Sequence, residues 1–172
     1  TPPNGITFTL DSGELEKFGN LLVWLVNPVV TNGVTTRVSS GSVGFVVSAG
    51  PPILTSINPN RKRVRSANFS LDIEGRCFHK ILRRDARGNI LRDRNGNELV
   101  SYQTVVRLNG NNKTTTVLGH ESARAIIPST DIQNIDPPKL ITAYNPPYAG
   151  NGGGVSGHRQ LIVFNPTPAT TS

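Results

Sequence analysis

The sequence of 172 residues predicts an all-β protein, on the evidence of composition, periodicity and turn residues. Gly and Pro number 17 and 13, and Thr, Ser, Asn and Val are abundant, a composition that disfavours helices. No window repeats apolar residues at helical spacing for long enough to make a convincing helix. Short apolar runs bounded by Gly, Pro and Asn recur throughout the chain, and such runs are typical of strands joined by tight turns.

One stretch of sequence occurs twice and sets the expected domain plan. Residues 6–28 and 123–146 each contain an apolar strand, an acidic turn ending in an aliphatic residue (Leu15 or Ile132), a second apolar strand and Asn-Pro. The similarity continues to a Ser-Gly pair and a short strand, at 40–47 in the first copy and 156–164 in the second. Repetition on this scale predicts a tandem array of one module.

Residues 1–50 contain only the second half of the repeated unit. Strands expected at 7–10, 21–26 and 43–47 cannot bury two faces alone. The missing strands are therefore expected from elsewhere in this chain or from another copy of it, unless the sequence has been cut from a longer protein. The candidate residues for contact with such strands are Leu22, Trp24, Phe45 and Val47, because half of a β-sandwich would otherwise expose them to solvent. A core position is the alternative for Trp24, which lies in an almost continuously apolar run.

Residues 51–168 read as a whole module, followed by a tail at 169–172. An entry strand at 51–60 ends in an Asn-Pro-Asn turn, and residues 66–75 alternate so that Phe69, Leu71 and Ile73 share one face. Further strands are expected at 77–82, 100–108 and 114–118, ahead of the second copy of the repeat. About seven short strands with these turns fit a sandwich of the immunoglobulin type.

Several motifs in this order resemble the IPT/TIG immunoglobulin-like domains that occur in tandem in bacterial surface proteins. They are PPILTSINPN, FSLDIEG, the Asn109-Gly110 pair before a Thr-rich strand, and the turn at 128–132 before a strand ending in Asn-Pro. The resemblance covers 51–168 in full and 6–50 as a partial copy. It implies tandem β-sandwich modules with an extracellular, cell-surface location. It implies little about activity, because such modules serve as spacers, adhesion units and dimerisation surfaces.

An insertion at 83–99 departs from the pattern of that family. It consists of two similar octads, 84–91 and 92–99, each combining Asp, a Gly-Asn turn and an apolar residue. The turns predict a protruding β-hairpin or meander. They also resemble segments of tyrosine-aspartate repeat proteins, although two octads are too few to identify that family.

Positive charge is concentrated in residues 61–94, whose net charge of +7 equals that of the whole chain. The candidate polyanion-binding residues are Arg61, Lys62, Arg63, Arg65, Arg83, Arg84, Arg87, Arg92 and Arg94. Such a basic face attracts acidic polysaccharide or another polyanion. The alternative is a solvated edge that its charge keeps from aggregating. Nucleic acid is disfavoured, because aromatic residues that could stack on bases are few in this stretch, which contains two phenylalanines, Phe69 and Phe78, and no tyrosine or tryptophan.

No catalytic constellation emerges from the sequence, and no cofactor or metal is expected. His79, His120 and His158 are far apart in sequence, and the single Cys77 is expected to be a small buried hydrophobe. No apolar run approaches the ~20 residues that a membrane span needs. The sequence therefore predicts a non-enzymatic structural and assembly module of an extracellular bacterial surface or filament protein, which joins other copies of the chain or neighbouring modules through strand edges. The alternative function is a polyanion- or carbohydrate-binding adhesion module that uses the basic face.

Overall fold

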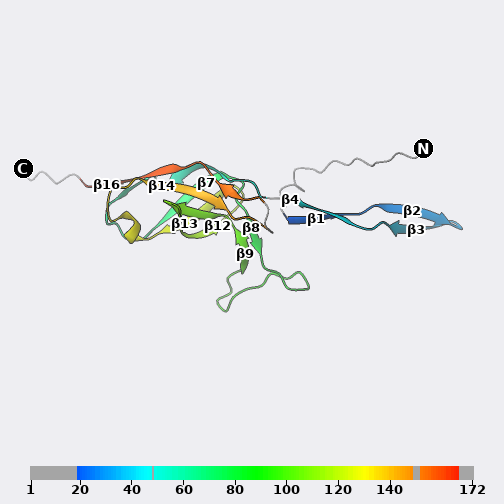
Figure 1. Cartoon of the computed structure of the whole chain (residues 1–172). Helices are drawn as coiled ribbons and strands as arrows, with labels where there is room; N and C mark the ends of the chain where they lie inside the picture. The colour runs from blue at the N-terminus through cyan, green and yellow to red at the C-terminus, as the bar shows by residue number, and fades with distance from the viewer. Residues whose placement is uncertain (1–18, 48, 149–151, 167–172) are drawn as a thin grey trace, which may run out of the picture. The chain divides into compact units, whose positions relative to one another are not determined.

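The computed structural model describes residues 19–47, 49–148 and 152–166 (Figure 1). The chain divides into two compact units, residues 1–48 and 49–172. Strands make up most of the described residues, among which η1 (Ser129–Ile132) is the single helical element. The predicted all-β class is confirmed, whereas the immunoglobulin-like tandem arrangement stays a prediction. The strand expected at 7–10 lies outside the described residues.

Unit 1 is described as a long two-stranded ribbon. Its strands are β1 (Gly19–Val23), β2 (Val26–Thr31), β3 (Val34–Ser39) and β4 (Val43–Val47), and β1 pairs with β4 and β2 with β3, both antiparallel. Asn32 and Gly33 connect β2 to β3 with φ of 53° and 77°, as a type I′ hairpin turn requires. The strand predicted at 21–26 is interrupted at Trp24 and Leu25, where the Leu25 N–H donates to Ser40 Oγ at 2.9 Å.

Unit 2 consists of two sheets and a short hairpin. The first sheet has the order β12-β13-β7-β5, and the second has the order β11-β10-β14-β16-β6 with β15 paired to β14. Their bounds are β5 (Ile53–Asn58), β6 (Arg61–Arg63), β7 (Phe69–Arg76), β10 (Val105–Leu108), β11 (Asn111–Asn112), β12 (Thr114–Val117), β13 (Ser122–Ile127), β14 (Lys139–Asn145), β15 (Gly154–Val155) and β16 (Arg159–Phe164). The hairpin pairs β8 (Lys80–Leu82) with β9 (Val100–Gln103) and carries the insertion, which extends from the sheets in Figure 1.

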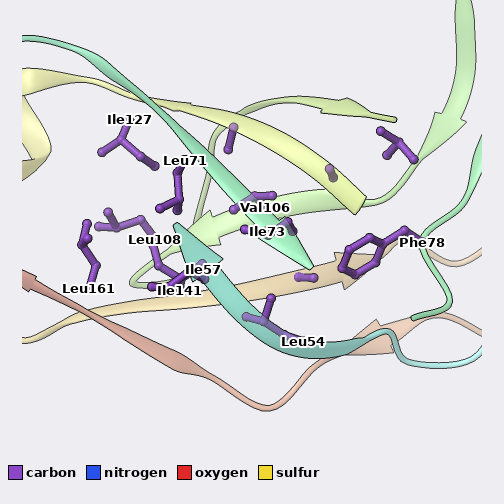
Figure 2. Close-up of a cluster of buried hydrophobic side chains, with 14 of the residues drawn as sticks. Leu54, Ile57, Leu71, Ile73, Phe78, Val106, Leu108, Ile127, Ile141 and Leu161 are labelled. Atoms are coloured by element: carbon purple, nitrogen blue, oxygen red, sulfur yellow. The ribbon is translucent and has the colours of Figure 1, made fainter. Parts of the chain in front are cut away.

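The two sheets of unit 2 enclose one apolar core, to which both contribute (Figure 2). Leu71 and Ile73 on β7 are almost fully buried and Phe69 is partly buried, which confirms the face predicted from their alternation. Ile141 on β14 and Leu161 on β16 approach them from the second sheet. Burial of these aliphatic side chains is the main stabilising contribution to unit 2.

A buried polar residue closes one end of this core. Asn145 is completely buried, and its Nδ2 donates to the carbonyl oxygens of Gly50 and Cys77, both at 2.9 Å. Its Oδ1 accepts from the Thr104 hydroxyl at 2.6 Å. Asn145 thus ties the entry segment of unit 2 to the chain after β7 and to the break between β9 and β10.

The prediction for Cys77 was wrong, because this residue is exposed. Its φ of 61° takes the chain out of the strand after β7, so that β8 begins only at Lys80. The carbonyl of Cys77, rather than its thiol, points to a buried partner. The neighbouring Phe78 takes the buried position.

Candidate functional site

The ribbon of unit 1 carries many exposed apolar side chains. They are Leu22, Trp24, Leu25, Val26, Val29, Val30, Val34, Val38 and Val43. All described residues of β2 and β3 are exposed. A two-stranded ribbon is marginally stable alone in water, and a contiguous apolar surface marks an interaction site. The ribbon is therefore the first candidate site.

The register of the ribbon divides its side chains between two faces. The Leu25 face comprises Val23, Leu25, Asn27, Val29, Thr31, Val34, Thr36, Val38 and Val43. The Trp24 face comprises Leu22, Trp24, Val26, Pro28, Val30, Thr35, Arg37 and Ser39. Both faces are largely apolar, and Arg37 is the one charged residue between Gly19 and Val47.

The four interface residues predicted from the sequence do not lie together. Leu22 and Trp24 are 61% and 55% exposed on the Trp24 face. Val47 is half-buried and pairs with Gly19, which places it on the Leu25 face. The backbone of Phe45 pairs with Leu21, and the Phe45 side chain lies outside the described part of the chain.

The edges of the ribbon are a second feature of this site. β1–β4 and β2–β3 are two-stranded sheets, so each of these strands has one edge without a backbone partner among the described residues. Proteins usually protect such edges with charges, prolines or covering loops. Pro28 and Arg37, which face each other across the β2–β3 pair, are the only such residues of β2 and β3. The ribbon can therefore accept a further strand along most of its length.

The basic insertion is built from two loops of the same design. In the first, Asp85 Oδ1 accepts from the N–H groups of Arg87 and Asn89 at 2.8 and 2.9 Å, and Asn89 Nδ2 donates to Asp85 Oδ2 at 3.0 Å. Arg84 Nη1 donates to the carbonyl of Gly88 at 2.7 Å. Gly88 has a φ of 86°, which glycine adopts without strain.

The second octad repeats every one of these bonds. Asp93 Oδ1 accepts from the N–H groups of Asn95 and Asn97, Asn97 Nδ2 donates to Asp93 Oδ2, and Arg92 Nη1 donates to the carbonyl of Gly96. A ring of backbone bonds closes the insertion: Leu91 N–H donates to Arg83 O, Leu99 N–H to Leu91 O, and Arg83 N–H to Leu99 O. The octads of the sequence are therefore also structural repeats.

Both loop aspartates are held ionised by these contacts. The side-chain amides of Asn89 and Asn97 lower the pKa of Asp85 and Asp93, and the backbone N–H groups of each loop lower it further.

The arginines of the insertion divide into two kinds. Arg84 and Arg92 hold the loops, whereas Arg83, Arg87 and Arg94 are exposed and make no side-chain bond within the described structure.

The structure does not bring all nine predicted basic residues together. Arg61, Lys62 and Arg63 form β6, at one edge of the second sheet, whereas β9 leads from the insertion into β10 near the other edge. Strands β14 and β16 lie between β10 and β6, and three spacings of ~4.8 Å separate β10 from β6 by about 14 Å. Sequence proximity could not show this, because the separation arises from strand order.

The residues of the β6 group make contacts of their own. The Arg61 guanidinium lies 5.2 Å from the centre of the Phe164 ring, and the Lys62 amino group lies 4.6 Å from that of Phe69. Both cations thus cover aromatic side chains. Arg63 and Arg65 line an open, largely polar hollow of about 750 Å³.

Two of the three histidines, far apart in sequence, meet in the structure. The rings of His79 and His120 lie edge to face with centres 6.0 Å apart. Burial lowers the pKa of His79, and the neighbouring His120 lowers it further. Among the described residues, no three His, Cys, Asp or Glu side chains gather as a metal site would require.

Comparison with known proteins adds no relative. No protein-family model, no curated protein and no solved structure matches this chain. In the part of the chain that the structure describes, no helix has the length and apolarity that a membrane crossing requires.

Proposed function

We propose that this chain is a non-enzymatic structural and assembly module of an extracellular bacterial surface or filament protein. It joins other copies of itself, or neighbouring modules, through the ribbon of unit 1. The observation that carries this proposal is the exposed apolar surface of the ribbon on both faces. Such a surface contributes free energy only when a partner removes it from water, by roughly 25 cal/mol for each Å² buried.

The open edges of the ribbon support the same function. An added strand gains main-chain hydrogen bonds along the edge, and apolar side chains on alternate positions supply specificity. Arg37 alone carries charge between Gly19 and Val47, so like-charge repulsion between copies is small. The ribbon suits association with another β structure better than exposure to solvent.

The assignment to IPT/TIG-like modules in tandem, and with it the cell-surface location, rests on the sequence motifs and the internal repeat. The two-layer β structure of unit 2 is compatible with that family. The proposed function assigns no catalytic role to any residue. A module of this kind acts by holding a defined shape and offering surfaces to its neighbours.

Sedimentation velocity of the full chain over a range of concentrations tests the assembly function. The sedimentation coefficient should rise with concentration, and Leu22→Asp should weaken this rise. Leu118→Asp is the matched control, because Leu118 is 59% exposed in unit 2 and Leu22 is 61% exposed in the ribbon. A wild-type chain that stays monomeric throughout, or equal effects of the two variants, would contradict the proposal.

A second candidate function is binding of a polyanion such as acidic polysaccharide by the insertion. The observation that favours it is that hydrogen bonds fix the loops while Arg83, Arg87 and Arg94 remain exposed without partners in the described structure. Arginines on a preformed loop lose little freedom when they bind an anion, which raises affinity.

Heparin chromatography measures this function. The double variant Arg87→Gln/Arg94→Gln should elute at lower salt than wild type, because two exposed cations near the anion are lost. The double variant Arg61→Gln/Arg63→Gln removes the same charge from the opposite sheet edge and should elute close to wild type. If both variants shift equally, retention reflects net charge and the insertion is no specific site.

A further inference from the structure

The internal repeat of the sequence is also a repeat of hydrogen bonds. In unit 1, Ser40 Oγ accepts from the N–H of Leu25 at 2.9 Å, and the N–H of Ser40 donates to Leu25 O at 2.8 Å. In unit 2, Ser156 Oγ accepts from the N–H of Ala143 at 2.9 Å, and the N–H of Ser156 donates to Ala143 O at 2.9 Å. Alignment of the two Asn-Pro pairs makes Leu25 the equivalent of Ala143. The main-chain groups of both residues therefore point to the side of the strand on which the serine lies.

Strand register agrees with this equivalence. Leu22 lies opposite Gly44 in unit 1, and its equivalent Leu140 lies opposite Gln160 in unit 2. Beyond the serine, both pairings shift by one residue, as the pairs Val26–Ser39 and Tyr144–Val155 show. β1 and the start of β2 therefore correspond to β14, and β4 corresponds to β16.

The equivalence shows what each outer edge of the β1–β4 pair can accept. In unit 2, β10 pairs with β14 in antiparallel direction, and β6 pairs with β16 in parallel direction. The corresponding edges of β1 and β4 have no backbone partner among the described residues. A strand added with the geometry of unit 2 would run antiparallel to β1 or parallel to β4.

Main-chain groups that could bind such a strand lie along the outer edge of β1. In unit 2, the N–H of Leu140 donates to Asn109 Oδ1 at 2.7 Å, and the Leu140 carbonyl accepts from the N–H of Asn109 at 2.8 Å, both on the β10 side. Leu22 is the equivalent of Leu140, and main-chain groups point to the two edges of a strand in turn, so those of Leu22 and Trp24 face the open edge. Pro28 follows the same alternation and lacks the N–H that would face this edge, which protects β2 and leaves β1 as the accepting strand.

The β1 strand of a second copy fits this edge. A twofold axis can set two identical strands antiparallel, which is the direction that the edge of β1 takes, and twofold dimers are the commonest symmetric assemblies. The sequence from Gly19 to Thr31 contains no charged residue, so identical strands meet without like-charge repulsion. Leu22 and Trp24 are 61% and 55% exposed on one face, where antiparallel pairing brings apolar side chains of the two copies together.

We propose that two copies of this chain join by antiparallel pairing of their β1 strands along this open edge. The joint forms one four-stranded sheet in which the two β1 strands are central and the two β4 strands are outermost. This inference rests on the proposed assembly function and adds to it the partner, the edge and the direction of the strands.

Sedimentation velocity of the full chain, with Leu22→Pro compared with Leu22→Ala, tests the edge. Both substitutions remove the leucine side chain, and only proline also removes the N–H that faces the second copy. The twofold axis doubles this loss, so Leu22→Pro should weaken dimerisation ~10-fold or more relative to Leu22→Ala. Thr35→Pro and Thr35→Ala are the matched control at the outer edge of β3, and their dimerisation should differ less than about twofold.

Spin-label distances between the two copies test the strand direction without proline. Cys77 is exposed and is the only cysteine of the chain, so Val26→Cys and Val30→Cys are labelled separately in a Cys77→Ser background. Antiparallel pairing centred on β1 predicts a distance about 27 Å longer at residue 30 than at residue 26, because each of the four residues adds ~3.4 Å in both copies. Parallel pairing would give equal distances at the two positions.

Three results would overturn this inference. Equal dimerisation of Leu22→Pro and Leu22→Ala, or equal label distances at residues 26 and 30 in a dimeric sample, would reject the β1 joint while leaving the assembly function intact. A wild-type chain that stays monomeric at all concentrations would reject both. The label distances decide the case in which Leu22→Pro unfolds the ribbon.

Discussion

Asn145→Ala should destabilise unit 2 more than any surface substitution. The side chain is fully buried and makes three hydrogen bonds, two to the carbonyl oxygens of Gly50 and Cys77 and one from the Thr104 hydroxyl. Alanine leaves all three of these groups without that partner. The Thr104 hydroxyl is buried, whereas the carbonyl oxygens belong to the exposed residues Gly50 and Cys77. Loss of its partner costs a buried polar group about 1 to 3 kcal/mol and costs the less buried carbonyls less, so the expected loss is ~2–4 kcal/mol.

A loss of this size is large for a domain of this length, whose total stability is typically ~5–15 kcal/mol. It corresponds to a decrease in Tm of roughly 7 to 14 °C. Near-ultraviolet circular dichroism in a Trp24→Phe background follows unit 2, because all three tyrosines, Tyr102, Tyr144 and Tyr148, lie in that unit.

The control is Asn27→Ala, which changes the equivalent residue of the first repeat. Asn27 is exposed in the ribbon, so this substitution should leave the unfolding of unit 2 within ~0.5 kcal/mol of wild type. A loss below ~1 kcal/mol for Asn145→Ala, or equal effects of the two variants, would refute the assignment of Asn145 as the residue that ties the entry segment to the core.

Three further predictions concern titratable groups. The pKa of His79 is lowered in the folded protein, so the unfolded chain binds a proton at this residue more readily than the folded chain does. Unit 2 should therefore lose stability as the pH falls below ~6.5. In urea unfolding, His79→Gln should weaken this dependence of stability on pH. The pKa of Asp93 is lowered, so ionised Asp93 stabilises its loop above the ordinary carboxyl pKa, and the loop should open as the pH falls through the lowered value. Asp93→Ala should open the loop at neutral pH. Hydrogen exchange of the Asn95 and Asn97 amides should then be faster, while exchange in β7 is unaffected. Burial raises the pKa of Tyr102 to about 12, so ultraviolet titration should show a tyrosine ionisation step near that pH. Persistence of this step in Tyr102→Phe would contradict the assignment.

Local patterns in the sequence predicted much of the fold. The alternation around Leu71 and Ile73 indicated the buried face of β7, because side chains of a strand point to its two faces in turn. The Gly-Asn turns predicted the loops of the insertion, since glycine there adopts the positive φ that the turns need. β4 spans Val43–Val47, the range predicted for it.

Features that depend on distant contacts could not be predicted. Cys77 lies in a run that resembles a strand, but its carbonyl is drawn to Asn145, which is 68 residues away. Thr104 interrupts the strand predicted at 100–108, because its buried hydroxyl bonds to Asn145 and accepts from the N–H of His79. The Ser-Gly pairs were visible as part of the repeat, yet the bonds that Ser40 makes required coordinates.

The candidate sites were predicted in part. The sequence indicated that Leu22 and Trp24 would be exposed unless a partner covered them, and both are exposed in the ribbon. It could not show that Val47 lies on the other face, since this follows from the pairing of β1 with β4. The basic residues were treated as one face, and the order of strands in the second sheet divides them into two groups.

Fluorescence of Trp24 tests the central claim, that the ribbon is the surface through which the chain assembles. Trp24 is the only tryptophan of the chain and is 55% exposed on the ribbon, so its emission reports this surface alone. As the protein concentration rises and the chain assembles, the emission maximum should move to shorter wavelength and quenching by acrylamide should weaken. Assembly seen by sedimentation without any change in Trp24 emission or quenching would place the contact elsewhere and contradict the account.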